Sequence, residues 1–436
     1  MKKRTIIAAA TSSGRGGISV IRMSGSSSRL IAEKMCGKLA ESWKFKKCSI
    51  RSKEGKTLDS GMVVFFQSPN SYTGEDVVEF HCHGNPTIVN LIIDEALVLG
   101  AVLAEPGEFT KTAFMNNKID LAQAESVADL ISAQSKSAVI AATSSLSGEF
   151  SSKINSLIDK IIKNRVVIEA NIDFPEEEVD GVLLKSVGEE LVEFLEEIES
   201  LLVETKKGIK LRDGYSVAIV GPPNAGKSSL LNVFARDNLA ITSDIPGTTR
   251  DLVKAEVLVG GVLIEFTDTA GLRDNPNDEV EKEGMGRSLE VSQKSNLTLL
   301  VQDINEERDV KVDLGNFLKV KNKIDLNRTY EKQEDVFYIS CSTGEGVVEL
   351  LHAIGENLGI DGGIETVFSS RKRHENSLIN AKMFINESVS SLHEGLALEL
   401  VAESLRSAHN ELGDILRPMS SDDLLGEIFS EFCIGK

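Results

Sequence analysis

The feature that most constrains this chain is the stretch at residues 215–231, YSVAIVGPPNAGKSSLL. Residues 217–220 are apolar and β-prone, which predicts a buried parallel strand. The strand runs into the pattern GxxxxGKS at residues 221–228, where backbone N–H groups and a helix N-terminus can surround phosphate oxygens. In such a loop Lys227 would reach the β- and γ-phosphates and Ser228 would ligate Mg²⁺. The stretch therefore predicts a nucleotide-binding P-loop in an α/β domain.

Two further motifs concern the γ-phosphate. The polar segment 244–251 contains threonines, and a threonine in such a switch segment can reach Mg²⁺ and the γ-phosphate. The sequence DTAG at 268–271 follows a predicted strand at 262–266. Its aspartate can hold Mg²⁺ through water, and its glycine can approach the γ-phosphate.

Two more motifs concern the base. NKID at 322–325 ends in Asp325, a carboxylate that suits the paired N–H donors of guanine, which adenine lacks. A last strand at 336–340 ends where the guanine oxygen could meet backbone N–H groups. Because four of these motifs follow predicted strands in the expected order, the sequence predicts a GTPase.

The predicted GTPase domain departs from the common pattern twice. Leu272 stands where many GTPases place a water-orienting glutamine, and the nearest candidate for that role is the acidic run 278–281. Residues 303–315 leave only thirteen residues between two presumed parallel strands. Since a crossover needs about a dozen residues, a rudimentary helix is expected there.

Composition narrows the cellular context. No apolar run approaches the roughly 20 residues that span a bilayer, and the five cysteines show no paired spacing, which suits a reducing cytoplasm. The net charge is −19, but residues 1–118 are net positive and the remainder is strongly negative. Any contact with tRNA is therefore expected in the basic N-terminal part or on a partner.

The fold class is predicted to be multidomain, with a Ras-like α/β P-loop domain inserted into a helical bundle. Residues 1–118 alternate as strands at 18–23, 63–66 and 77–83, with a helix at 86–99, which predicts an α+β domain. Residues 119–210 and 371–436 are predicted to form one discontinuous helical domain around the G domain at 211–370. Gly208 and Asp213-Gly214 predict a linker between them. His81 and His83 share a strand face, but two ligands do not make a zinc site.

The whole sequence resembles the MnmE (TrmE) family of bacterial tRNA-modification GTPases. The resemblance covers nearly the full length and is carried by GRGGISVIRMSG, NSYTGEDVVEFHCHG, PGEFTKTAFMNNKIDLAQAE, the four nucleotide motifs and the terminal SDDLLGEIFSEFCIGK. It implies a potassium-activated GTPase that works with the FAD-dependent partner MnmG (GidA). Together they would install an aminomethyl-type (carboxymethylaminomethyl) group at C5 of the tRNA wobble uridine, using 5-formyl- or methylene-tetrahydrofolate. It also implies a homodimer held by the N-terminal folate-binding domain, a heterotetramer with MnmG and a cytoplasmic location.

The resemblance also implies the site residues. Those that would contact GTP are Asn224, Ala225, Gly226, Lys227, Ser228, Ser229, Ser243, Asp244, Ile245, Pro246, Gly247, Thr248, Thr249, Asp268, Thr269, Ala270, Gly271, Asn322, Lys323, Asp325, Ser340, Cys341 and Ser342. Ser228 and Thr249 would ligate Mg²⁺, and Asn224, Ser243, Ile245 and Thr248 would ligate K⁺. Glu281 matches the family's water-orienting glutamate, and Arg22, Glu79, Lys118 and Lys436 would contact folate. Cys433 is either a reactive thiol near folate or an inert buried cysteine.

A second function class is a GTPase switch in ribosome assembly, of the Era or Der kind. Such a switch would need an appended RNA-binding module, and no stretch of this sequence has that character.

Overall fold

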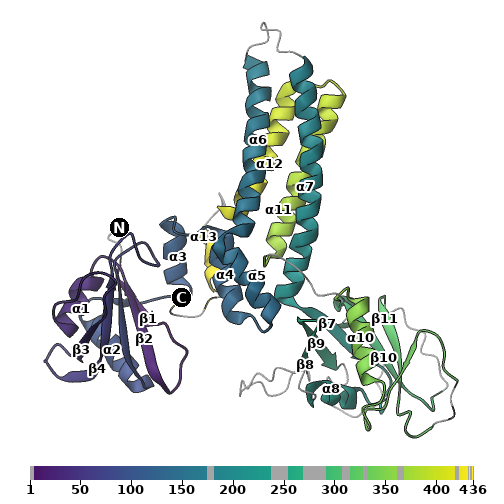
Figure 1. Cartoon of the computed structure of the whole chain (residues 1–436), viewed down its shortest axis with the longest axis horizontal. Coiled ribbons are helices and arrows are strands. Elements are labelled where there is room, and N and C mark those ends of the chain that lie inside the picture. Colours follow the sequence, from purple (N-terminus) through teal and green to yellow (C-terminus); the bar gives the residue numbers. More distant parts are fainter. Residues whose placement is uncertain are drawn as a thin grey trace. The chain divides into compact units, whose positions relative to one another are not determined.

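The computed structural model describes residues 4–173, 181–236, 254–268, 291–306, 315–327, 329, 331–360, 368–417, 422–430, 432 and 435, and side chains are not described at 181–183, 236, 422–424 and 427 (Figure 1). The chain divides into two compact units, one of residues 1–128, 146–173 and 402–436 and one of residues 129–145 and 174–401. The architecture is multidomain: an N-terminal α+β domain, helices before and after an inserted sequence, and a Ras-like α/β domain formed by that insertion. The exact domain boundaries given above remain a prediction.

The N-terminal domain is built on a six-stranded sheet in the order β3-β4-β5-β2-β1-β6. Its strands are β1 Ile6–Ala9, β2 Gly16–Ser24, β3 Lys46–Arg51, β4 Thr57–Phe66, β5 Val77–Gly84 and β6 Val102–Leu103, and its helices are α1 Ser28–Cys36, α2 Pro86–Val98 and α3 Glu108–Met115. The strands and the helix predicted at 18–23, 63–66, 77–83 and 86–99 are confirmed. One face of the sheet packs Ile21, Met23 and Phe80 against α1 and α2. Strand alternation therefore leaves Arg22, Glu79 and His81 on the opposite face.

Helices make up most of the chain outside the two sheets. They are α4 Leu121–Ser132, α5 Lys136–Ser147, α6 Glu149–Asp173, α7 Gly181–Asp213, α11 Lys372–His393, α12 Leu398–Leu416 and α13 Asp422–Ser430. The helical character predicted on both sides of the inserted domain is confirmed (Figure 1). None of the described helices combines the length with the low charge that crossing a membrane requires.

The linker predicted from Gly208 is wrong. Helix α7 continues through Gly208 to Asp213 and leads directly into the next strand. A Cβ at Gly208 would lie 2.6 Å from the carbonyl oxygen of Phe368, so only glycine allows the returning chain to pass this close. That close approach outweighs the low helix propensity of glycine, which is about 1 kcal/mol. The helix ends instead at Gly214, whose φ of 71° is the left-handed conformation of a helix C-cap.

The inserted domain is a six-stranded sheet in the order β12-β11-β10-β7-β9-β8. Its elements are β7 Tyr215–Val220, α8 Lys227–Arg236, β8 Lys254–Val259, β9 Val262–Asp268, β10 Leu297–Asp303, β11 Phe317–Asn322, β12 Val336–Tyr338 and α10 Val347–Asn357. All neighbours pair in parallel except β8 with β9. The buried parallel strand predicted before the P-loop is β7, and the parallel pairing of β10 with β11 is also confirmed. Residues 307–314 lie outside the described residues, so the rudimentary helix expected there stays a prediction.

Candidate functional site

The P-loop lies between β7 and α8 and is held close to the neighbouring strand ends. A Cβ at Gly221 would stand 2.0 Å from the carbonyl oxygen of Val301, and one at Gly226 would stand 2.1 Å from Nδ2 of Asn322. Both glycines have positive φ, as does Asn224 at 63°. Only glycine fits at the first two positions, so the loop backbone can follow the path that a phosphate cradle requires.

Two side chains at the start of α8 are suited to bind phosphate and Mg²⁺. Lys227 is 7% exposed, and its Nζ donates to the carbonyl oxygens of Gly221 and Pro222, both at 2.8 Å. The ammonium group thus lies over the loop that would cradle the phosphates. Ser228 Oγ donates to Oδ2 of Asp268 at 2.6 Å, and Asp268 ends β9 at 1% exposure. A hydroxyl and a carboxylate oxygen are the hard ligands that Mg²⁺ prefers, so these residues fit the ion.

Asn322 joins the P-loop to the guanine loops. Its Nδ2 donates to the carbonyl oxygen of Ala225 at 3.0 Å, and its Oδ1 accepts from the backbone N–H groups of Lys323 at 2.8 Å and Cys341 at 3.2 Å. Because Asn322 is 1% exposed, these bonds are made away from water. The P-loop and the two predicted base motifs are thereby held together.

The base-recognition loops are also connected to each other. Ser340 Oγ donates to Oδ1 of Asp325 at 2.6 Å, which orients the carboxylate expected to accept from guanine. Lys323 Nζ contacts Oδ2 of Asp303 at 2.8 Å. Burial alone would raise the pKa of Asp303, but hydrogen bonds from Lys323 and Asn305 outweigh it and lower the pKa. Burial raises the pKa of the Cys341 thiol to about 11, so this cysteine stays protonated and serves packing rather than nucleophilic chemistry.

Many predicted site residues lie outside the described residues. They are Ser243, Asp244, Ile245, Pro246, Gly247, Thr248, Thr249, Thr269, Ala270, Gly271, Glu281, Cys433 and Lys436. The magnesium ligand Thr249, the potassium ligands other than Asn224 and the water-orienting glutamate therefore remain predictions. Two further predicted residues, Ser229 on α8 and Ser342 after β12, lie within the described part of the chain, and both are exposed.

A second polar site lies on the N-terminal sheet. Arg22 on β2 stands directly opposite Glu79 on β5, and its Nε donates to Oε1 of Glu79 at 2.8 Å. The Arg22 guanidinium lies 5.2 Å from the ring centroid of Tyr72 and 5.9 Å from that of Phe109. His81 Nε2 lies 3.5 Å from Oε2 of Glu79. The predicted folate pair therefore forms a partly buried ion pair flanked by two aromatic rings.

The loop that carries Tyr72 connects this pair to the third predicted folate residue. Lys118 Nζ donates to the carbonyl oxygen of Pro69 at 3.1 Å, and its side chain packs on Gly74. The sequence reasoning missed Tyr72 as a site residue, although its aromatic side chain lies in a segment that is otherwise polar. Phe109 is fully buried on α3 and supports Arg22 from the core.

The C-terminus reaches the same sheet. A Cβ at Gly435, where φ is 99°, would lie 1.9 Å from the carbonyl oxygen of Ala9, so the tail passes against the end of β1. Ala8 of β1 pairs in register with Arg22 of β2. Gly435 thus lies one strand from the Arg22–Glu79 pair, and the folate role of Lys436 stays a prediction.

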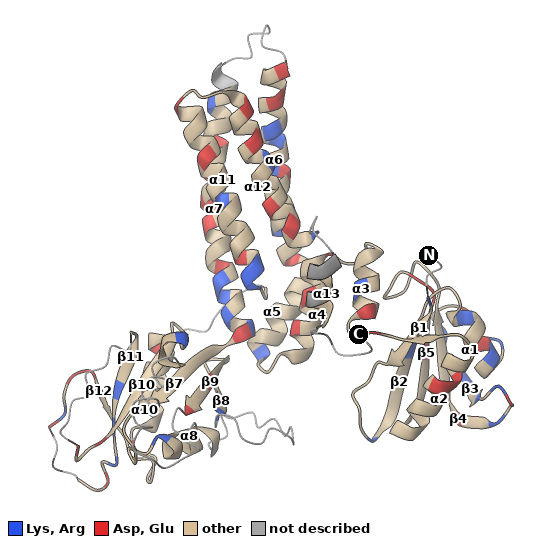
Figure 2. Ribbon diagram, turned by 180° about the vertical axis from the view of Figure 1, so that it is seen from behind, with Lys and Arg blue, Asp and Glu red and all other residues tan. Residues whose placement is uncertain are grey.

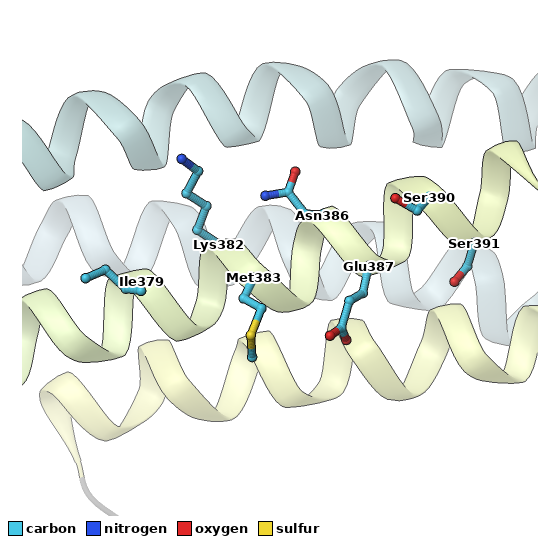
Figure 3. A pocket seen from close by; sticks show the side chains of 7 residues that line it. All are labelled: Ile379, Lys382, Met383, Asn386, Glu387, Ser390 and Ser391. Atoms are coloured by element: carbon cyan, nitrogen blue, oxygen red, sulfur yellow. The ribbon is translucent and has the colours of Figure 1, made fainter.

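A shallow hollow on α11 is unrelated to either site. Its lining consists of Ile379, Lys382, Met383, Asn386, Glu387, Ser390 and Ser391 (Figure 3). Lys382 and Asn386 point to one side of the helix and Met383 and Glu387 to the other (Figure 3). Lys382 Nζ pairs with Oε1 of Glu199 on α7 at 2.6 Å. Because one helix supplies the whole lining, the hollow is a surface groove rather than a built binding pocket.

Comparison with known proteins extends these findings to the full chain. Residues 5–118 match the family model described as the GTP-binding protein TrmE N-terminus, and residues 121–433 match the MnmE helical domain. The protein described as tRNA modification GTPase MnmE in Nitrosomonas europaea is 42% identical over 447 residues, covering 99% of both chains. The protein of that description in Legionella pneumophila is 42% identical over 444 residues, again covering 99% of both. A third in Coxiella burnetii is 42% identical over 450 residues, covering 99% of this chain and 98% of the relative.

Proposed function

The chain belongs to the MnmE family of tRNA modification GTPases, and from that premise we propose a complete activity for it. It hydrolyses GTP in the course of tRNA modification. With an FAD-dependent MnmG partner, it installs a carboxymethylaminomethyl-type group at C5 of the wobble uridine, in the cytoplasm. The active assembly is a homodimer of this chain joined to MnmG as a heterotetramer.

One observation carries this proposal. The identity of 42% extends over 99% of the chain, so the N-terminal, helical and GTPase parts are all retained together. A GTPase switch in ribosome assembly is not favoured, because the full-length relatives are tRNA modification GTPases.

The GTPase chemistry starts from the Ser228–Asp268 contact. Ser228 and Thr249 would ligate Mg²⁺, and Asp268, which accepts from Ser228 at 2.6 Å, would hold the ion through water. The ion would supply positive charge to the phosphates. Asn224, at the exposed tip of the loop, offers a neutral amide oxygen to K⁺ together with Ser243, Ile245 and Thr248. The potassium ion would neutralise charge that develops at the leaving phosphate. Glu281 orients the attacking water, since Leu272 cannot.

The folate chemistry belongs to the face of the N-terminal sheet with Arg22 and Glu79. A bound 5-formyl- or methylene-tetrahydrofolate would supply one carbon to the uridine. Glu79 suits the N–H donors of a pteridine, and Arg22, Lys118 and Lys436 suit the carboxylates of a glutamyl tail. The half-buried ring of Tyr72, close to Arg22, offers flat apolar surface to a pteridine, while the fully buried ring of Phe109 packs behind Arg22. The residues present therefore fit a reduced folate.

The test of the function has two parts. GTP turnover in KCl should exceed turnover in NaCl or LiCl of equal ionic strength by at least about tenfold, which corresponds to ~1.4 kcal/mol of barrier. Nucleoside analysis of tRNA from a deletion strain should show loss of the C5 modification and recovery when this chain is supplied. Wobble uridines that remain modified in the deletion strain would refute the modification activity.

Glu281 has its own test with a matched control. Glu281→Ala should retain nucleotide affinity and lose about 10²-fold or more in turnover, the usual contribution of a group that positions or activates water. Glu279→Ala, in the same acidic run, should keep its turnover. Equal turnover in Glu281→Ala and the unmodified protein would assign the water-orienting role elsewhere.

A further inference from the structure

Basic side chains cluster at one end of the α7–α11 helix pair, in a chain whose net charge is −19. The last turns of α7 lead into β7, and α11 begins where the chain returns from the inserted domain, so both ends belong to the same compact unit. The basic residues there, which we call the basic junction patch, are Lys206, Lys207, Lys210, Arg212, Arg371, Lys372 and Arg373. Figure 2 shows Lys and Arg gathered on these helix ends beside β7.

Electrostatic contacts connect three of the four lysines of the patch. Lys206 Nζ lies 3.9 Å from Oε1 of Glu375, and Lys372 Nζ lies 2.5 Å from its Oε2. Burial lowers the pKa of Lys210, and the positive charge of Lys372 lowers it further, while Asp213 and Glu375 oppose this. Three lysines thus surround one carboxylate, and the local charge is positive.

The patch divides into a buried structural part and an exposed part. Arg212 Nε and an Nη of Arg371 contact Oδ1 of Asp129 at 2.9 and 3.0 Å, so the two arginines are engaged within the fold. The side chains of Lys206 and Lys372 are instead 64% and 71% exposed, and Lys207 is exposed as well. Lys206, Lys207 and Lys372 therefore present their charge to solvent, whereas Lys210 is half-buried.

Helix stability explains only a small part of the patch. Cations in the last turn of a helix are favoured by its dipole, which accounts for Lys210 and Arg212 on α7. It does not account for Lys206 and Lys207, which lie before that turn. Lys372 and Arg373 occupy the first turn of α11, where the same dipole disfavours positive charge by about 0.3–1 kcal/mol each. The helix dipole therefore does not account for Lys206, Lys207 or Lys372, and the exposed positive charge that they bring to these helix ends points to an anionic ligand.

We propose that the basic junction patch binds the phosphodiester backbone of the tRNA substrate. The inference rests on the proposed function and adds the place of contact. Lysine ammonium groups are point charges that neutralise phosphates without reading bases. Tyr215 is the aromatic residue beside the patch, and Lys210 Nζ lies 4.7 Å from its ring centroid. This ring face is therefore occupied and does not stack on a base. The contact therefore positions tRNA irrespective of its sequence. The sequence analysis expected tRNA contact at residues 1–118 because the net charge of that part is positive. Net charge over a long stretch does not reveal a local basic patch within an acidic region.

The test removes exposed charge without touching the nucleotide site. Lys206→Gln/Lys207→Gln/Lys372→Gln should weaken tRNA binding at least about tenfold, measured by fluorescence anisotropy over a salt series. The slope of log K against log salt should become shallower by ~0.7–0.9 for each phosphate that the variant no longer neutralises. GTP turnover without tRNA should stay within twofold of the unmodified protein, which also shows that the fold is intact.

A matched variant separates the possible outcomes. Lys38→Gln/Lys53→Gln/Lys56→Gln removes the same charge from exposed positions of the N-terminal domain and should leave tRNA binding unchanged. The proposal is overturned if the junction variant binds tRNA as tightly as the unmodified protein. It is equally overturned if only binding to purified MnmG weakens, which would make the patch a protein contact. Neither result would affect the deletion-strain analysis, so failure of this inference is distinguishable from failure of the proposed function.

Discussion

At the scale of single residues, the main contribution of Asn322 to the nucleotide site is to hold its loops together, in addition to any contact that it could make with the base. Its side chain bonds the P-loop at Ala225 and the backbone of two guanine loops, at 1% exposure. Asn322→Ala should therefore weaken GDP and GTP binding alike by about 10- to 100-fold, since each lost bond contributes about 0.5–1.5 kcal/mol. Fluorescent nucleotide titration measures this. Asn316→Ala, just before the other end of β11, should bind normally, and a loss there would show that any asparagine truncation loosens the sheet.

Asp325 provides a second residue-scale prediction, on base specificity. Its carboxylate, oriented by Ser340, would accept from both N–H donors of guanine. Asp325→Asn replaces one acceptor by a donor, which matches the extra carbonyl of xanthine. Affinity for GTP should fall by about 10²-fold or more, because each hydrogen bond to the charged carboxylate contributes about 1.5–3 kcal/mol. Affinity for xanthosine triphosphate should rise. Competition between the two nucleotides measures the switch. Retained preference for GTP would remove Asp325 from base recognition.

At the scale of elements, the contact between α6 and α12 makes stability depend on pH. Arg165 Nη1 lies 3.4 Å from Nδ1 of His409. Burial lowers the pKa of His409, and the charge of Arg165 lowers it further. The unfolded chain therefore binds a proton at His409 before the folded chain does, and the free energy of unfolding should fall as pH drops below about 6.5. Denaturant unfolding from pH 7.5 to 5.5 should show a smaller decline in His409→Gln. His393→Gln, exposed on α11, should keep the original slope.

How far the elements follow from the sequence depends on where their stabilising contacts lie. The strand, loop and helix at residues 215–236 are predictable because local patterning and chain-neighbour chemistry agree there. Gly208 misled the sequence reasoning, because the contact that keeps it within a helix comes from Phe368, far along the chain. Tyr72 was missed for the same reason, since its role depends on Arg22, which lies on β2. Sequence patterns report neighbours along the chain, whereas these positions are defined by neighbours in space.

At the scale of the whole molecule, the unit that contains the GTPase sheet also includes residues 129–145, which the sequence assigns to the helical domain. Asp129 connects these stretches. Its Oδ1 contacts Arg212 at the end of α7 and Arg371 just before α11, and its Oδ2 accepts from Ser369 at 3.0 Å. One carboxylate at 7% exposure thus holds both points at which the chain enters and leaves the inserted domain.

Removing that carboxylate should destabilise the whole unit rather than one helix. Asp129→Ala removes the anion beside the buried guanidinium of Arg371, while Arg212 keeps its contact with Asp213 at 3.0 Å. Loss of one partner of a buried ion pair costs about 3–5 kcal/mol. For a unit of this size, each kcal/mol lowers the melting temperature by roughly 2–4 °C, so calorimetry should show a shift of roughly 10 °C in one transition. Asp129→Asn keeps an oxygen acceptor without the charge and should fall between. Glu193→Ala, which removes an exposed carboxylate from α7, should leave melting unchanged. If Asp129→Ala and Glu193→Ala melt at the same temperature, packing alone holds the two chain segments that lead into and out of the inserted domain. The charge of Asp129 then contributes nothing measurable to the stability of the unit.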